Sequence, residues 1–151
     1  MGWTSKPSAF TKTIEADLTK KQKDIVIDAL QGVVLQSPVD TGAFRASHRV
    51  SINQTDQSFN EAEKDKGGGS TISKGTSALS RLVPYSTVYI QTNAPYATAI
   101  EFGQYPNPVK KGSYDKKAKK YVIKSVGGFS QQAPQGVYGL TFNYIAQKYG
   151  G

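Results

Sequence analysis

A long stretch of helical periodicity that ends at Pro38 constrains the fold of this chain more than any other feature. After Ser8, which can cap a helix, apolar side chains recur every three or four positions, at Phe10, Ile14, Leu18, Ile25, Ala29 and Val33. The apolar stripe is widened further along, by Ile27, Leu30 and Val34. Proline lacks a backbone donor and cannot continue a helix. The sequence therefore predicts one long amino-terminal helix that is buried against more than one neighbour.

Two pairs of short elements are predicted after this helix. A turn of helix capped by Asp40 or Thr41 leads into a strand over residues 47–53, where apolar and polar residues alternate. A second alternating segment, over residues 84–92, leads into a short helix over residues 96–102. The pattern favours two strands that each adjoin a short helix.

The last third of the chain adds two predicted elements. Residues 121–126 are typical of a strand, and the apolar spacing of residues 137–148 favours a helix. A length of 151 residues is that of a single domain. We therefore expect one α+β domain over residues 1–151. In it, the long helix packs on a small, mainly antiparallel sheet, with a short central helix, long loops and a carboxyl-terminal helix.

Residues 54–81 are predicted to form an extended loop or assembly arm. This stretch holds three consecutive glycines and many charges, but few apolar residues that could anchor it to a core. Loops longer than roughly 15 residues in a compact domain are usually functional or disordered. We therefore expect a partner subunit to hold this segment in place.

Positive charge is concentrated in the last third of the chain. The formal net charge is +8, yet residues 104–151 hold eight lysines and one acidic residue, Asp115. Residues 104–128 are predicted to form an exposed basic hairpin or arm. Two interpretations stay open, a solvated basic loop and a contact with phosphates or with an acidic protein surface. The candidate contact residues are Lys110, Lys111, Lys116, Lys117, Lys119 and Lys120.

Several kinds of chemistry are excluded or unsupported by composition and motifs. The chain has no cysteine and one histidine, which excludes disulfides, thiolate sites and multi-histidine metal sites. The order Ser73-Lys74-Gly75-Thr76 does not match a phosphate-binding loop, and no nucleophile elbow is present. We therefore assign no catalytic, metal-binding or cofactor-binding residue and expect no cofactor and no membrane span. His48 is predicted to be a surface or interface residue.

Two short strings carry a resemblance to a known family. Residues 38–47 read Pro-Val-Asp-Thr-Gly-Ala-Phe-Arg-Ala-Ser, and residues 96–103 read Tyr-Ala-Thr-Ala-Ile-Glu-Phe-Gly. Their order and separation resemble the tail-completion, or neck, proteins of long-tailed bacteriophages. The resemblance covers about residues 10–53 and 85–103 and extends weakly to 133–135. The glycine-rich stretch and the lysine-rich segment depart from the family pattern.

The resemblance implies a non-enzymatic structural protein of the virion. Such a protein is expected in the host cytoplasm during assembly, and then at the tail-to-head interface. There it forms a ring, with a hexamer favoured, that completes the tail and joins it to the head connector. The expected partners are head-connector or stopper, tail-terminator and tail-tube proteins, with transient contact to passing DNA.

Eight residues of the two strings are the candidates for structural turns or interfaces. Asp40 is expected to cap the short helix and Gly42 to permit its turn. Arg45 and Glu101 are either ion-pair partners or ordinary surface charges. The complete set is Asp40, Thr41, Gly42, Arg45, Tyr96, Glu101, Phe102 and Gly103. An alternative function is a basic nucleic-acid-binding module, in which residues 109–124 supply lysines and two tyrosines that stack on bases, Tyr114 and Tyr121.

Overall fold

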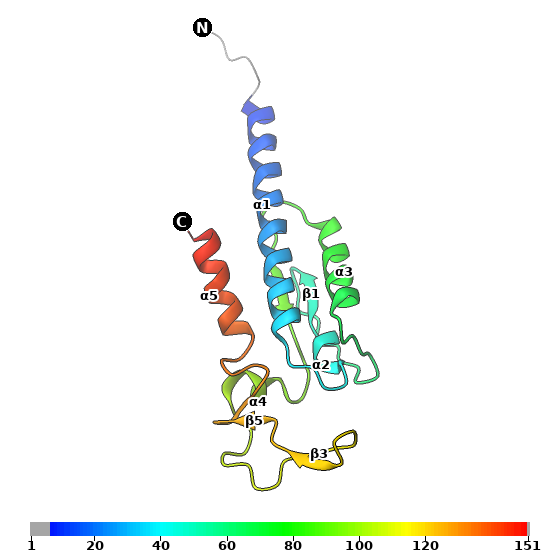
Figure 1. Ribbon diagram of the computed structural model, residues 1–151. Helices are drawn as coiled ribbons and strands as arrows, with labels where there is room; N and C mark the ends of the chain where they lie inside the picture. Colours follow the sequence, from blue (N-terminus) through cyan, green and yellow to red (C-terminus); the bar gives the residue numbers. More distant parts are fainter. Residues whose placement is uncertain (1–6, 151) are drawn as a thin grey trace.

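The long helix predicted from the sequence is the main element of the computed structural model, which describes residues 7–150 (Figure 1). Helix α1 (Pro7–Gln36) begins one residue before Ser8, which therefore lies in its first turn, and it ends before Pro38. Its second half packs against the other elements, whereas its first half projects beyond them (Figure 1). Three apolar side chains on this first half are 59%, 42% and 49% exposed, those of Phe10, Ile14 and Leu18.

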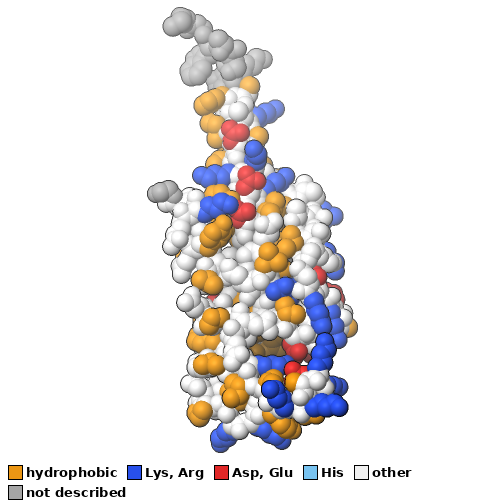
Figure 2. All heavy atoms as spheres, viewed as in Figure 1, with side chains coloured by type: hydrophobic (Ala, Val, Ile, Leu, Met, Phe, Trp, Pro, Cys, Tyr) orange, Lys and Arg blue, Asp and Glu red, His pale blue; other side chains and the backbone are white. Residues whose placement is uncertain are grey.

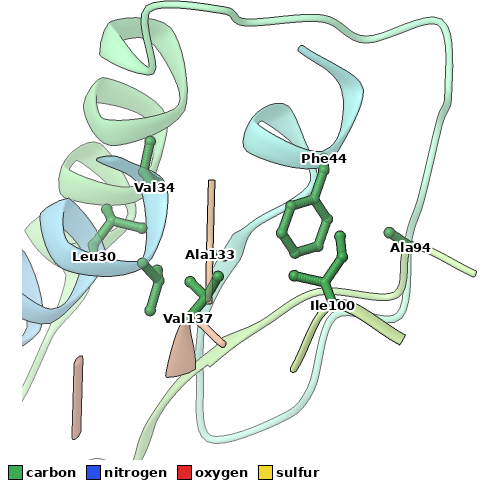
Figure 3. Packing of buried hydrophobic residues seen from close by; sticks show 8 residues of the cluster. Leu30, Val34, Phe44, Ala94, Ile100, Ala133 and Val137 are labelled. Carbon is green, nitrogen blue, oxygen red and sulfur yellow. The ribbon is translucent and has the colours of Figure 1, made fainter. Parts of the chain in front are cut away.

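The hydrophobic core lies against the second half of α1. It gathers side chains from this helix, from α2 (Ala43–Ala46), from α4 (Ala97–Phe102) and from the segment that precedes the last helix. Its members are Leu30, Val33, Val34, Phe44, Ala94, Ile100, Ala133 and Val137 (Figure 3). The core thus joins four stretches of chain that lie far apart in the sequence.

The predicted α+β fold is confirmed, and its strands pair antiparallel throughout. Strand β1 (Arg49–Ile52) pairs with β2 (Val88–Gln91), so that Val50 lies opposite Ile90. Both of these side chains are partly buried against the core. The two predicted strand segments, residues 47–53 and 84–92, therefore pair with each other.

The remaining strands form two further hairpins in the described residues. Strand β3 (Ser113–Asp115) pairs with β4 (Lys120–Val122), and β5 (Ser125–Val126) pairs with β6 (Phe129–Ser130). The strand expected over residues 121–126 is therefore split between two separate two-stranded sheets.

The carboxyl-terminal segment is helical, as predicted. Helix α5 (Tyr138–Tyr149) lies beside α1 (Figure 1). Near its end, Lys148 Nζ lies 2.6 Å from Asp28 Oδ2 on α1, and the hydroxyl of Tyr149 donates to the same carboxylate. These contacts fix the end of α5 to the long helix.

The prediction of a loop over residues 54–81 is wrong for the second half of that range. Residues in this half form α3 (Gly69–Ala78) and a 3-10 turn, η1 (Leu79–Arg81). The Asp65 carboxylate accepts hydrogen bonds at the start of α3, from Gly68 N at 2.9 Å and from Thr71 N and Oγ1 at 2.8 Å. A helix rich in glycine, serine and threonine is poorly marked in the sequence, because its stability comes from capping and packing.

The first half of that range is a loop, but it is held by contacts within the chain. The carbonyl oxygen of Asp56 accepts hydrogen bonds from Gln91 Nε2 at 2.6 Å and from Asn93 Nδ2 at 3.0 Å. A guanidinium nitrogen of Arg49 lies 2.9 Å from Glu63 Oε2. Contacts within the chain therefore hold this part of the segment, and the expected contact with a partner subunit stays a prediction.

Substitution of Gly75 by alanine tests how closely α3 approaches the core. A Cβ at Gly75 would overlap Leu30 Cδ2 and would lie 2.9 Å from Val50 Cγ2. We expect Gly75→Ala to lower the free energy of unfolding by about 2 kcal/mol, because these side chains must move to make room. Gly69→Ala in the same helix is the control, since no atom lies within 4 Å of its Cβ position. Equal losses for both variants in urea titrations would contradict the packing described here.

Candidate functional site

The two strings that carry the resemblance pack against each other. We name residues 37–47 and 93–103 the turn junction. The rings of Phe44 and Tyr96, one from each string, have centroids 5.8 Å apart. Phe44 also shares the buried core with Ala94 and Ile100. The two strings therefore form one structural unit, although they are far apart in the sequence.

Gly42 and Thr41 shape the start of α2, whereas Asp40 does not. Gly42 is the amino-terminal cap, with a φ of 93° that favours glycine, and Thr41 Oγ1 accepts a hydrogen bond from Ala43 N at 3.2 Å. The expected cap by Asp40 is wrong, because among the described residues its carboxylate accepts no hydrogen bond from the first amides of α2. Asp40 is largely exposed, and its Oδ1 lies 3.7 Å from Lys124 Nζ.

The expected ion pair between Arg45 and Glu101 is wrong, and the reading of both as ordinary surface charges is wrong as well. The Arg45 guanidinium donates to three carbonyl oxygens, those of Leu35 at 3.1 Å, Ser37 at 3.0 Å and Lys66 at 2.8 Å. Two of these carbonyls belong to the carboxyl-terminal end of α1 and the residues just after it. A cation at this end also complements the helix dipole.

Glu101 binds backbone amides at the start of α5, whereas Arg45 binds backbone carbonyls at the end of α1. Its carboxylate accepts three backbone hydrogen bonds, from Val137 N at 2.8 Å, Tyr138 N at 2.9 Å and Gly139 N at 2.8 Å. The first amides of a helix have no partner within the helix, and a carboxylate satisfies them well. Glu101 therefore connects α4 to α5.

The remaining candidates of the second string have different surroundings. Tyr96 is partly buried against the core, and burial, with Glu61 nearby, raises the pKa of its hydroxyl. Gly103 closes α4 with a φ of 67° and lies against the ring of Phe129. The side chain of Phe102 is exposed. Phe102 is thus available to a partner, whereas Tyr96 and Gly103 hold the fold.

A buried polar chain centred on His48 was missed by the sequence analysis. His48 is 3% exposed, so its prediction as a surface or interface residue is wrong. Its Nε2 lies 2.6 Å from Ser37 Oγ, and its Nδ1 lies 2.7 Å from the hydroxyl of Tyr138. Burial lowers the imidazole pKa to about 3, with smaller contributions from Arg49 and Arg45. The partners of His48 are 11 and 90 residues away, and no local pattern marks them.

The hydrogen-bonded pair of Ser37 and His48 stabilises the fold. Ser37 is 2% exposed, so a substrate cannot reach its hydroxyl. The Ser37 hydroxyl also lies 2.5 Å from the Val33 carbonyl oxygen, within the last turn of α1. The hydrogen bonds that join the side chains of Ser37, His48 and Tyr138 therefore connect the end of α1 to the start of β1 and to α5.

The six candidate lysines fall into two groups. Lys110 and Lys111 line a cavity beside the turn at residues 38–42, whereas the other four lie on the β3–β4 hairpin. Basic side chains gather over the end of the molecule where β3 lies (Figure 2). All six side chains are exposed.

The two tyrosines of this hairpin contact each other. The rings of Tyr114 and Tyr121 lie edge to face, with centroids 5.3 Å apart, and Lys111 Nζ lies 4.9 Å from the Tyr121 centroid. Mutual packing leaves less free ring face for stacking on nucleic-acid bases. Both side chains are nevertheless 53% exposed, so the nucleic-acid-binding alternative stays a prediction.

No family model, curated protein or solved structure matches the chain. Within residues 7–150, no helix has the length and apolarity needed to cross a membrane. No group of three or more histidine, aspartate or glutamate side chains in that range is placed to hold a metal ion.

Proposed function

We propose that this protein is a non-enzymatic structural component of a long-tailed bacteriophage virion. It forms a ring that completes the tail and joins it to the head connector. The observation that carries the proposal is the turn junction, in which the two strings that resemble tail-completion proteins meet through Phe44 and Tyr96.

Exposed apolar side chains give a second line of support. Phe10, Ile14 and Leu18 repeat at every turn of the projecting half of α1, and Phe102 and Phe142 are exposed elsewhere. Single exposed apolar residues are ordinary, but a regular stripe on a projecting helix is typical of a surface that is covered in an assembly. A ring of identical subunits supplies such a cover.

The proposal is tested by virion assembly without this protein. We expect complete heads and separate tails in electron micrographs, because the joint between them is missing. In a complementation experiment, Phe10→Ser with Ile14→Ser should restore joining poorly, whereas Lys12→Ser, on the same half of α1, should restore it. Normally joined, infectious particles in the absence of the protein would refute the neck assignment. A salt-dependent shift of DNA in a gel, with no ring seen by negative stain, would favour the nucleic-acid-binding module.

A further inference from the structure

A cavity of about 800 Å³ lies between the turn at residues 38–42 and the start of the basic arm, residues 104–128. The molecule is hollowed in this region, with acidic and basic side chains at the edge (Figure 2). Much of the lining is apolar, from Phe44, Tyr96, Ile100, Tyr105, Pro106 and Val109. Apolar cavities of roughly 300 to 1,000 Å³ that carry a few charged groups are typical binding sites.

The charges around the cavity are unbalanced. Asp40 and Lys124 both line it, and they pair with each other at 3.7 Å. Lys110 and Lys111 also line it, but neither forms an ion pair with a described residue. The acidic Glu61 on the lining makes no ion pair with them. Two ammonium groups therefore stand beside an apolar cavity without carboxylate partners.

We propose that this cavity binds an acidic segment of a partner protein that carries a bulky apolar side chain. The apolar side chain enters the cavity, and the flanking carboxylates lie against Lys110 and Lys111. This assignment rests on the cavity and its charges, and it does not depend on a place for the protein in a virion.

A protein segment suits the cavity better than a nucleic acid does. The phosphodiester backbone has no apolar group that could cover Tyr105, Pro106 or Val109, more accessible apolar residues of the lining. Lysines without arginines also lack the planar fork that binds phosphate through two parallel hydrogen bonds. An acidic peptide supplies both features that the cavity requires, an apolar group and carboxylates.

Fluorescence anisotropy with labelled peptides tests the proposal. The probe is the hexapeptide Glu-Asp-Leu-Phe-Asp-Glu. In one control, serine replaces its two apolar residues, and in the other, lysine replaces its four acids. We expect saturable binding of the probe and at least about tenfold weaker binding of each control. No binding of the probe at about 1 mM, or equal binding of the serine control, would overturn the proposal.

Two charge-matched variants locate the binding site. Lys110→Gln with Lys111→Gln removes two charges at the cavity, whereas Lys116→Gln with Lys117→Gln removes two charges on the hairpin, outside the lining. We expect the first pair to weaken probe binding about tenfold and the second less than about twofold. Equal weakening would show a diffuse charge effect and would overturn the site.

A third variant blocks the cavity without changing the charge. Ser113 lines the cavity from β3. Ser113→Trp should therefore abolish probe binding while the thermal unfolding midpoint stays within a few degrees. A DNA hexanucleotide that binds more tightly than the probe, and is lost with the hairpin variant, would assign the lysines to nucleic acid instead.

Discussion

Acidification from about pH 7.5 to about pH 4.5 should lower the free energy of unfolding by about 3 kcal/mol through His48 alone. Burial lowers its pKa in the folded protein to about 3, from the ordinary histidine value of 6.5. Between these two values the unfolded chain binds a proton that the folded chain excludes. This contribution to stability is therefore complete above about pH 6.5 and falls by about 1.4 kcal/mol per pH unit below it.

The titration of His48 can be measured without a variant. The chain has one histidine, so its imidazole proton resonances are unambiguous in an NMR titration. We expect the folded-state chemical shift to stay at its neutral value down to about pH 4.5. A titration midpoint near the ordinary histidine value of 6.5 in the folded protein would show that the imidazole is not buried in the way described. Urea titrations across the same range give the matching loss of stability.

Glu101→Ala should lower the free energy of unfolding by about 3 kcal/mol. The substitution leaves the three amides at Val137, Tyr138 and Gly139 without their carboxylate. It also removes the only side chain seen to bind these amides in the described residues. The loss should appear in urea titrations together with weaker circular-dichroism signal from α5.

Two further variants separate charge from geometry. Glu101→Gln keeps one acceptor oxygen and should lose about half as much stability as the alanine variant. Asp17→Ala removes an exposed acid on α1 and should change stability by less than about 0.5 kcal/mol. A loss for Glu101→Ala no larger than that for Asp17→Ala would show that Glu101 does not hold α5 in solution.

The elements predicted well are those whose signals are local. The apolar stripe after Ser8 predicted the start of α1 to within one residue, and Pro38 predicted its end. The alternation of apolar and polar residues predicted β1 and β2. The short helix α2 was expected from a cap at residue 40 or 41, and α4 from the turn at residues 93–95 before it and Gly103 after it. Each of these signals acts within a few residues of chain, and the backbone obeys it directly.

The features that were missed depend on partners far along the chain. Helix α3 is poor in strong helix formers, and it is stabilised by the Asp65 cap and the close approach of Gly75 to Leu30. An ion pair between Arg45 and Glu101 was a candidate because the two side chains have opposite charges. In the fold, each instead satisfies backbone groups at a different helix end, and a sequence does not show which ends lie near which side chains.

Because the first half of α1 projects beyond the other elements, the free energy needed to open backbone hydrogen bonds differs between its two halves. Around Leu30 and Val34, which are 0% exposed, backbone hydrogen bonds open only when the core separates. The first turns of α1 extend beyond the other elements (Figure 1), and Phe10 in these turns is 59% exposed, so they fray at little free-energy cost. A neighbour that covers Phe10, Ile14 and Leu18 would therefore order the first turns of α1. The free-energy cost of ordering them would reduce the binding affinity. The subunit would be stiffer inside an assembly than outside it.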